Sequence, residues 1–393
     1  MYKRLCNPLL SNSFFLFGAR ATGKTSLLKG LLPAGAKILW IDLLDQVLYQ
    51  ELLTHPERFV EMIPKDFGKN CWVVTDEIQR LPGLLNYVHK LIEERKIFFA
   101  LTGSSARKLK RGGANLLAGR AFINTLHPLS YRELGKDFNL DFVLNWGSLP
   151  FVFQNQTHRH NPLALKEYLR AYVAGYLREE IKEEQIVRQL DPFARFLEVA
   201  AQHNGNIINA SKIARDSLTD SAAVLRYFEI LADTLLGFFL EPYNRSVRKV
   251  QTAKSKFYFF DVGVRRAIEG VLDSTVVSQS STYGQSFEHF FILECKRLSQ
   301  YLKKEDRLYY IRTKDDVEID LLIERSRKEL WAIEIKSSQR VDEKEFTRSI
   351  ALAKDLKVSR FLVASREPRK RYLKDIEIWP WQEVLSELYG ESD

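Results

Sequence analysis

The chain has 393 residues, of which 45% are hydrophobic and 28% charged, and its formal net charge at pH 7 is +9. Abundant aromatic residues (25 Phe, 16 Tyr and 6 Trp) supply enough apolar surface for folded cores and exclude intrinsic disorder. The longest apolar runs, such as residues 14–17 and 235–240, are far shorter than the roughly 18 residues of a membrane-spanning helix, so we expect no membrane association. Three widely separated cysteines predict neither a disulfide framework nor a Cys-x-x-Cys metal site, and we expect a cytoplasmic protein without a secretory signal.

A glycine-rich phosphate loop follows the first predicted strand. Residues 13–16 are apolar and β-prone, and they run into Gly18-Ala-Arg-Ala-Thr-Gly23-Lys24-Thr25 and then a helix-forming segment. This is the G-x-x-x-x-G-K-T pattern in the strand–loop–helix setting that it requires. Its glycines let backbone N–H groups close around phosphates, its lysine neutralises phosphate oxygens, and its threonine hydroxyl ligates Mg²⁺. The residues expected to bind ATP are Gly18, Ala19, Arg20, Ala21, Thr22, Gly23, Lys24, Thr25 and Ser26, with Lys24 also acting in catalysis.

Two later strands are expected to bring catalytic side chains to this loop. A strand predicted at residues 71–74 leads into Asp76 and Glu77. A carboxylate at the end of a buried strand beside a phosphate loop is the Walker B arrangement, in which Asp76 holds Mg²⁺ through water and Glu77 orients or deprotonates the attacking water. The next strand, at residues 97–102, leads to Ser104, which we expect to contact the γ-phosphate or the attacking water.

A basic loop comes after this strand. Residues 107–111 hold four Lys and Arg side chains, and Leu117-Ala-Gly-Arg120 follows. Such a loop is suited to place an arginine in a neighbouring subunit's nucleotide site or to contact a nucleic-acid backbone, and a solvated surface loop is the alternative.

The segments TDEIQRLP, LTGSSARKL, LAGR and HPLSYREL occur in this order over residues 75–134. With the phosphate loop, they resemble a family of prokaryotic AAA-type P-loop ATPases close to the archaeal and signal-transducing (STAND-like) ATPases. The resemblance extends over nearly the whole chain. It implies ATP binding and hydrolysis, Mg²⁺, and a ring or another homo-oligomer, and by position it makes Arg120 the candidate arginine finger.

The middle of the chain has the pattern of a winged helix. Helices are predicted over residues 162–190, 193–203, 212–216 and 222–234, and strands at 237–241 and 256–260. The last of these helices exposes Arg226, and the segment between the strands is basic. Contact with duplex DNA is one interpretation, and a winged helix used for packing is the other. The basic side chains of the wing are Arg245, Arg248, Lys249, Lys254 and Lys256.

Two consecutive strands near the C-terminus carry acidic side chains. The predicted order is a helix at 285–298, strands at 308–313, 318–324 and 330–336, a helix at 342–356, and strands at 360–364 and 376–379. Asp320 lies on one strand, and Glu334 and Lys336 lie on the next, where residues two apart share a face. Two carboxylates and an ammonium on one face predict a divalent-metal site, to which Glu288 on the leading helix adds an oxygen ligand.

This order and spacing resemble the PD-(D/E)XK nuclease superfamily, although Ile319 stands where the motif has Pro. The resemblance implies that Asp320 and Glu334 bind Mg²⁺ or Mn²⁺, that Lys336 activates water, and that Glu288 is the helix-borne acid. A domain that keeps this fold without the chemistry is the alternative.

The sequence therefore predicts an α/β protein with three domains. These are an AAA-type P-loop ATPase domain (1–150), a helical connector with a winged helix (151–275) and a restriction-endonuclease-like domain (276–393). We expect a Mg²⁺-dependent ATP hydrolase that forms a homo-oligomer and binds, remodels or translocates on duplex or branched DNA, which the C-terminal domain would cleave. The alternative is a nucleotide-controlled switch or scaffold whose nuclease-like domain is an inactive protein-interaction module.

Overall fold

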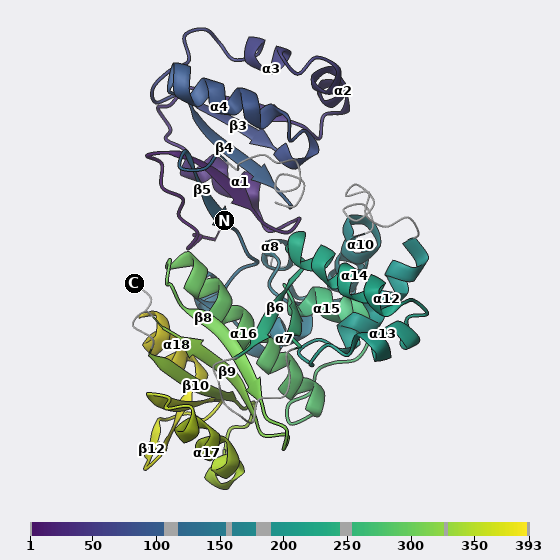
Figure 1. Ribbon diagram of the computed structural model, residues 1–393, viewed down its shortest axis with the longest axis vertical. Coiled ribbons are helices and arrows are strands. Elements are labelled where there is room, and N and C mark those ends of the chain that lie inside the picture. Colours follow the sequence, from purple (N-terminus) through teal and green to yellow (C-terminus); the bar gives the residue numbers. More distant parts are fainter. Residues whose placement is uncertain are drawn as a thin grey trace. The chain divides into compact units, whose positions relative to one another are not determined.

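The structure, a computed structural model, describes residues 2–105, 117–154, 159–177, 190–243, 254–325 and 329–390. The chain divides into two compact units, each of which is described by itself (Figure 1). Unit 1 consists of Met1–Leu129, Leu149–Phe151 and Ile230–Leu236. Unit 2 consists of Ser130–Ser148, Val152–Glu229 and Gly237–Asp393.

Unit 1 is built on a parallel five-stranded sheet in the order β2-β3-β4-β1-β5. This parallel sheet is consistent with the predicted α/β domain of the AAA type, and β5 lies where no strand was predicted. Strands β1, β3 and β4 are buried along nearly their whole length, as continuous apolar runs in a parallel sheet require. The strands are β1 (Ser13–Phe17), β2 (Ile38–Asp42), β3 (Trp72–Asp76), β4 (Phe98–Gly103) and β5 (Ala121–Thr125), and the helices are α1 (Lys24–Leu31), α2 (Gln46–Thr54), α3 (Arg58–Glu61), the 3₁₀ helix η1 (Ile78–Arg80) and α4 (Leu84–Arg95).

The register of this sheet brings the loops after three strands to one edge. Phe17 at the end of β1 pairs with Gly103 at the end of β4, and Thr75 near the end of β3 pairs with Leu101 on β4. Because the carboxyl ends of parallel strands meet at the same edge, the loop after β1 lies beside the residues that follow β3 and β4.

Unit 2 contains an eight-stranded sheet, with helices before, between and after its strands in chain order. Several helices begin with a side-chain cap: Ser130 and Glu133 form a reciprocal capping box, and Asp261 accepts a hydrogen bond from the backbone N–H of Val264 (3.0 Å). The helices that lie wholly in this unit are α6 (Tyr131–Leu134), η2 (Gly135–Asp137), α7 (Leu140–Trp146), α10 (Pro162–Ala171), the π-helix η3 (Tyr172–Leu177), α12 (Leu190–Gln202), α13 (Ala210–Asp216), α15 (Val262–Glu269), α16 (Ser281–Tyr301), η4 (Glu343–Phe346), α17 (Thr347–Asp355) and α18 (Trp381–Tyr389). The helices α8 (Pro150–Phe153) and α14 (Ser221–Asp233) have residues in both units.

The sheet of unit 2 has the order β12-β13-β11-β10-β9-β8-β6-β7. The β6–β7 hairpin joins it through parallel pairing of Glu241 with Tyr309 and of Pro242 with Tyr310. The hairpin that we expected in a winged helix is therefore continuous with the strands that carry Asp320 and Glu334. The strands are β6 (Gly237–Pro242), β7 (Lys256–Phe259), β8 (Arg307–Arg312), β9 (Glu318–Glu324), β10 (Leu330–Ile335), β11 (Arg360–Ser365), β12 (Arg371–Leu373) and β13 (Ile376–Pro380).

The observed elements of unit 2 lie close to those predicted. Strand β9 has the predicted bounds, and the helix expected at 342–356 is divided into η4 and α17. The helix expected over 162–190 is an α-helix to Ala171 and a π-helix to Leu177, beyond which residues 178–189 lie outside the described part. The wing residues Arg245, Arg248 and Lys249 and the loop at 107–111 also lie outside the described residues.

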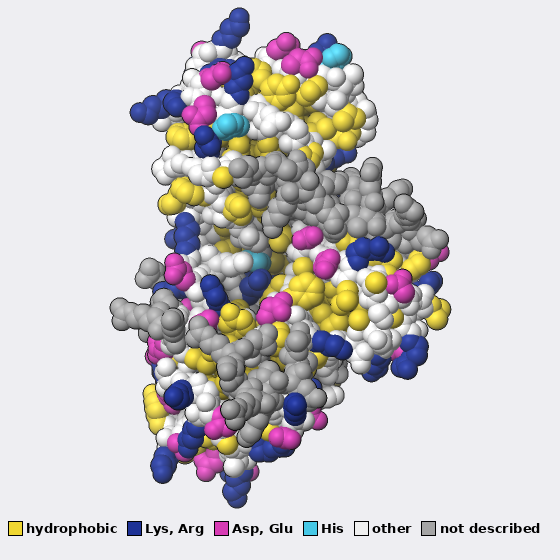
Figure 2. All heavy atoms as spheres, in the orientation of Figure 1, with side chains coloured by type: hydrophobic (Ala, Val, Ile, Leu, Met, Phe, Trp, Pro, Cys, Tyr) yellow, Lys and Arg dark blue, Asp and Glu magenta, His cyan; other side chains and the backbone are white. Residues whose placement is uncertain are grey.

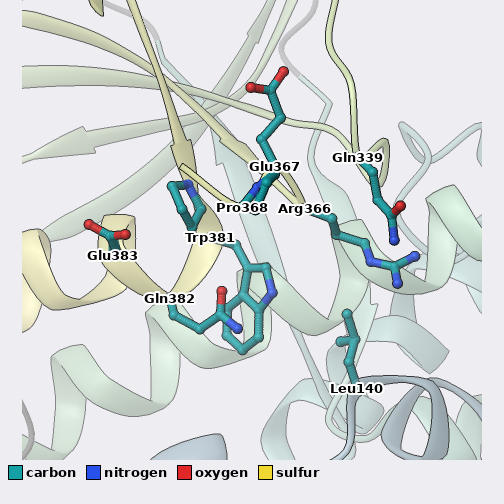
Figure 3. A pocket seen from close by; sticks show the side chains of 9 residues that line it. Leu140, Gln339, Arg366, Glu367, Pro368, Trp381, Gln382 and Glu383 are labelled. Atoms are coloured by element: carbon teal, nitrogen blue, oxygen red, sulfur yellow. The ribbon is translucent and has the colours of Figure 1, made fainter. Parts of the chain in front are cut away.

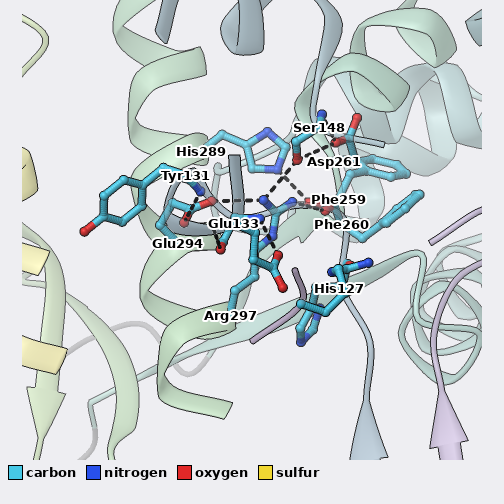
Figure 4. A network of polar contacts seen from close by, with 12 residues as sticks. His127, Tyr131, Glu133, Ser148, Phe259, Phe260, Asp261, His289, Glu294 and Arg297 are labelled. Carbon is cyan, nitrogen blue, oxygen red and sulfur yellow. Dashed lines mark hydrogen bonds and ion pairs between the residues drawn. The ribbon is translucent and has the colours of Figure 1, made fainter. Parts of the chain in front are cut away.

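A buried polar network ties α16 to other segments of unit 2 (Figure 4). Glu294 and Arg297, one turn apart on α16, form a buried ion pair with 3.0 Å between Oε1 and Nη1. Arg297 also donates to Ser148 Oγ and to the Phe260 carbonyl, both at 3.1 Å, and the backbone N–H of Ser148 donates to Asp261 (2.7 Å). Burial raises the pKa of Glu294 to about 7. Buried charges of this kind require such partners, so the network fixes where α16 lies within the unit.

Among the described residues, none of the helices combines the length and apolarity that crossing a membrane requires.

Candidate functional site

The loop after β1 has the backbone geometry of a phosphate cradle. The Gly18 N–H donates to the Gly103 carbonyl (3.2 Å), and a Cβ at Gly18 would lie 2.4 Å from the carbonyl oxygen of Leu126. Gly23, which precedes α1, has φ +93°, a conformation that favours glycine. Both glycines of the pattern are thus required by the observed backbone.

Lys24 lies inside this loop, at the first residue of α1. Its side chain is buried, and Nζ donates to the Gly18 carbonyl (2.8 Å) and more weakly to the Ala19 carbonyl (3.4 Å). The ammonium is therefore held among the same backbone groups that the sequence pattern assigns to phosphate binding.

The remaining loop residues surround this lysine. The Thr22 hydroxyl donates to the Ala19 carbonyl (2.8 Å), and the Thr22 carbonyl accepts a hydrogen bond from Arg4 Nη1 (2.8 Å). Ala21 has a positive φ of 62°, and Ser26 is exposed in the first turn of α1. Arg4, which closes the loop from the N-terminal segment, was not found by sequence reasoning because no motif contains it.

Thr25 and Asp76 meet at the edge of the sheet. Thr25 Oγ1 donates to Asp76 Oδ2 (3.0 Å), and the Thr102 hydroxyl donates to the other carboxylate oxygen. A hydroxyl and a carboxylate are the hard oxygen donors that Mg²⁺ prefers. These residues therefore fit the divalent metal that an AAA domain implies.

Glu77 occupies a tight turn directly after β3. It has φ +55°, and its backbone N–H donates to Thr102 Oγ1 (3.3 Å). Its buried carboxylate accepts a hydrogen bond from Gln79 Nε2, which also donates to Ser104 Oγ (3.1 Å). The structure therefore brings Glu77 and Ser104 together through Gln79, which donates to both.

Arg120 lies just before β5 and forms an ion pair with Glu93 on α4. Its side chain is 40% exposed. Within its own chain, Arg120 is thus engaged with Glu93.

The C-terminal carboxylates lie on neighbouring strands of unit 2. Asp320 on β9 accepts a hydrogen bond from the backbone N–H of Ile335 (2.8 Å), and Glu334 on β10 is buried. Burial, followed by repulsion from Glu334, raises the pKa of Asp320 to about 7, and burial also raises the pKa of Glu334. Lys336 lies close enough to lower both pKa values, and its ammonium is 5.5 Å from the centre of the Phe346 ring. The structure thus brings these three predicted residues together.

Lys256 was predicted to be an exposed residue of a DNA-binding wing, and the structure shows it buried. Its side chain is 5% exposed, and Nζ lies 2.5 Å from Glu318 Oε1 and 3.7 Å from Glu288 Oε1. Burial lowers the pKa of Lys256, but the carboxylates of Glu288, Glu318 and Asp320 outweigh that effect, so its pKa lies above the usual range for lysine. The interpretation of Lys256 as a surface contact for DNA is wrong, because it faces these carboxylates.

Glu288 has a different environment from the one expected of a metal ligand. It accepts a hydrogen bond from the Tyr258 hydroxyl (2.7 Å) and faces the Lys256 ammonium. In the part of the chain that the structure describes, no group of three or more His, Cys, Asp or Glu side chains is arranged to hold a metal ion. The predicted set of Glu288, Asp320 and Glu334 therefore does not fit a three-carboxylate metal centre.

A hollow of about 550 Å³ lies elsewhere in unit 2, lined in part by Arg366, Glu367 and Trp381 (Figure 3). The Arg366 guanidinium lies over the Tyr283 ring, with 4.9 Å to its centre. Glu367 Oε1 accepts hydrogen bonds from the backbone N–H of Val341 and from Arg371, both at 2.8 Å. Because these charged groups already have partners, we assign no ligand to this hollow.

Three family models match successive parts of this chain. Residues 11–135 match a family model described as an AAA domain, and residues 137–275 and 283–384 match two models described as domains of unknown function, DUF8612 and DUF4143. An uncharacterised protein of Mycobacterium tuberculosis is 25% identical over 299 residues, or 75% of this chain, and one of Methanocaldococcus jannaschii is 23% identical over 369 residues, or 87% of this chain. The matched region spans 65% of the length of the first relative and 79% of the second.

A solved structure, Can2 from Sulfobacillus thermosulfidooxidans in complex with cyclic tetra-adenylate, aligns with 96% of this chain and 97% of its own. Its sequence identity is 12% and its TM-score 0.18, which is too low to indicate a shared fold. The predicted AAA-type domain is confirmed by the family match, whereas the winged helix and the nuclease-like fold stay predictions. The N-terminal part of the chain is thus a P-loop ATPase-like AAA domain, followed by two domains of unknown function.

Proposed function

We propose that the chain is a Mg²⁺-dependent ATP hydrolase. The observation that carries the proposal is the 3.0 Å hydrogen bond between Thr25 Oγ1 and Asp76 Oδ2, beside the buried ammonium of Lys24. An AAA domain implies a nucleotide and a divalent metal, and these oxygens are suitable ligands for Mg²⁺. When bound, Mg²⁺ would stabilise negative charge on phosphate oxygens as a Lewis acid.

The other side chains of the site have complementary roles in this proposal. Lys24 neutralises charge on the phosphates and holds them against the loop. Glu77 accepts the proton of the attacking water in this proposal, since Gln79 links its carboxylate to Ser104, directly after β4. Gln79 and Ser104 fix the direction of that carboxylate.

Phosphate release by the purified full chain tests the proposal. We expect turnover of ATP in Mg²⁺ and its loss when EDTA is added. Equal rates with and without EDTA would contradict a Mg²⁺-dependent site.

We propose further that the chain assembles into a homo-oligomer in which Arg120 acts in a neighbour's site. The support is that Arg120 is half-exposed and directed to Glu93 in its own chain. Mixing two inactive variants, Arg120→Ala and Glu77→Gln, tests this directly. A finger supplied by the neighbour predicts partial recovery of hydrolysis in the mixture, and no recovery would contradict it.

We propose duplex or branched DNA as the partner of the ATPase. Helices α12, α13 and α14, followed by the β6–β7 hairpin, have the order of a winged helix, and Arg226 and Lys254 are exposed. On the face shown in Figure 2, Lys and Arg side chains are interspersed with Asp and Glu. The described surface in this view therefore carries charges of both signs. The ATPase rate with and without each DNA at low salt is the test, and absence of both binding and stimulation would remove DNA from the proposal.

A nucleotide-controlled switch or scaffold is the second candidate. The observation that favours its inactive C-terminal domain is Lys256, whose ammonium lies beside Glu288, a carboxylate that we expected to bind a catalytic metal. DNA cleavage is for this reason not part of the proposal. A switch predicts slow turnover, retained nucleotide and a change of assembly between ADP and an ATP analogue. Light scattering after gel filtration measures that assembly, and identical masses with both nucleotides would count against the switch.

A further inference from the structure

The carboxylate cluster of unit 2 contains a cation that belongs to the chain itself. Lys256 is 5% exposed, and its ammonium lies 2.5 Å from Glu318 Oε1 and 3.7 Å from Glu288 Oε1. On another side it faces the Tyr310 ring, with 5.2 Å from Nζ to the ring centre. A buried ammonium is stable there because carboxylates and an aromatic ring replace the water that it has lost.

The partners of Lys256 come from two elements that are distant in sequence. Glu288 is on α16, and Glu318 is the first residue of β9. Tyr258, two residues after Lys256 on β7, donates a 2.7 Å hydrogen bond to Glu288 Oε1, the same oxygen that faces the ammonium. Lys256 and Tyr258 thus contact the same carboxylate oxygen of Glu288.

The backbone holds Lys256 in this place. Lys256 pairs with Leu240 in the β6–β7 hairpin and forms an isolated bridge with Ile207. Strand β6 pairs in turn with β8, which lies next to β9 in the sheet. Because the sheet register fixes its Cα, the ammonium can leave the cluster only by moving its own side chain.

Two ammonium groups of the chain act on Asp320. Both Lys256 and Lys336 interact electrostatically with Asp320. A divalent ion bound by Asp320 and Glu334 would therefore approach two fixed positive charges, and it could not also use Glu288 or Glu318 without displacing Lys256.

We propose that the Lys256 ammonium is a tethered cation that takes the place of a divalent metal in this cluster, so that the C-terminal site binds neither Mg²⁺ nor Mn²⁺. The cluster then serves to fasten the β6–β7 hairpin to α16 and β9. This inference does not depend on ATP hydrolysis, since it concerns residues of unit 2 alone.

Mn²⁺ binding to the full chain tests the proposal, with free Mn²⁺ measured by electron paramagnetic resonance. All proteins carry Asp76→Asn and contain no nucleotide, so that the phosphate-loop metal site is disabled. With Lys256 in place, we expect the protein to bind the same amount of Mn²⁺ whether or not Asp320→Asn is added. Binding that Asp320→Asn abolishes would overturn the proposal, and this comparison leaves Lys256 unchanged.

Lys256→Met gives the complementary result, because it removes the charge and keeps an unbranched side chain. We expect this variant to gain a Mn²⁺ site at least tenfold tighter than any in the parent, lost again when Asp320→Asn is added. Lys254→Met, at an exposed position two residues earlier, is the matched control and should gain nothing. If Lys256→Met melts at a lower temperature, Mn²⁺ should raise that temperature by several degrees. The proposal would be contradicted if Lys256→Met gained no Mn²⁺ site and Mn²⁺ left its melting temperature unchanged.

Discussion

The hydroxyl of Thr25 donates a 3.0 Å hydrogen bond to Oδ2 of Asp76, across 51 positions of sequence. Thr25 lies in α1, after β1, and Asp76 is the last residue of β3. In the sheet, β1 and β3 are separated by β4. Thr102, on β4 itself, donates to the other oxygen of the same carboxylate. The Asp76 carboxylate is therefore held by hydroxyls from two segments, α1 and β4, which fixes the oxygens that we expect to hold Mg²⁺.

Replacing Lys24 should weaken nucleotide binding. Lys24→Ala removes a buried ammonium whose hydrogen bonds to phosphate we expect to be worth about 1.5–3 kcal/mol, or roughly ten- to a hundredfold in affinity. Titration with a fluorescent ATP analogue measures the change. Lys29→Ala, at an exposed position of the same helix, is the control and should bind normally. Equal affinity in both variants would mean that Lys24 does not contact the phosphates.

Gln79 should act on the rate of hydrolysis through Glu77. Gln79→Ala removes the group that donates to both the Glu77 carboxylate and Ser104, so the general base loses its fixed direction. We expect kcat to fall roughly ten- to a hundredfold with little change in KM. Gln79→Asn, which keeps an amide, should recover part of the rate. A change confined to KM would show that Gln79 serves binding instead.

Two glycines of unit 1 should respond in opposite ways to alanine. A Cβ at Gly18 would lie 2.4 Å from the Leu126 carbonyl oxygen, so Gly18→Ala forces the phosphate loop to move at a cost of about 1–3 kcal/mol. Gly30, in α1, has nothing within 4 Å of that position, and Gly30→Ala should raise the free energy of unfolding by about 0.5–1 kcal/mol. Chemical unfolding followed by nucleotide titration checks both. Normal nucleotide affinity in Gly18→Ala would contradict the close packing of the loop.

His289 should make unit 2 less stable in acid. Its ring Nε2 lies 2.6 Å from the Phe259 carbonyl and must donate to it, which leaves Nδ1 without a proton or a partner in the described structure. Burial, opposed by that hydrogen bond and aided by Arg265 and Arg297, lowers the pKa of His289 to about 3. Below pH 6.5, His289 therefore binds a proton in the unfolded chain but stays neutral in the folded chain. The free energy of unfolding falls as the pH decreases from 6.5 towards 3.

The contribution of His289 should reach about 1.4 kcal/mol per pH unit over that window. His289→Gln keeps a donor for the Phe259 carbonyl and does not titrate, so its free energy of unfolding should fall less steeply with acid. Urea unfolding of the wild type and of His289→Gln between pH 7 and pH 5 measures how the free energy of unfolding of each depends on pH. Parallel pH profiles would show that His289 is able to take up its proton in the folded state.

The site in unit 1 was predictable because its signals are local. The phosphate loop is a continuous pattern, and Asp76, Glu77 and Ser104 directly follow apolar strands whose parallel pairing brings their ends together. Gln79 was missed for a physical reason. Its contact with Glu77 depends on the positive φ of Glu77, which turns the chain back towards Ser104, and no residue type in the segment signals that turn.

The site in unit 2 was predicted in part. Asp320, Glu334 and Lys336 are neighbours because an antiparallel pair of strands carries them, which spacing alone can indicate. Lys256 was misinterpreted because it ends a basic stretch, and counting charges does not tell which side chain points inward. The direction of Lys256 follows from pairing of β6 with β8, a contact between residues far apart in sequence.

Phosphate release from Mg²⁺–ATP, compared between the wild-type chain and Glu77→Gln at equal nucleotide occupancy, is the most direct measurement of the proposed activity. Loss of the general base should lower the rate about a hundredfold or more while ATP remains bound. A wild-type rate no higher than that of Lys24→Ala, or unchanged turnover in Glu77→Gln, would contradict the assignment of this site as an ATPase.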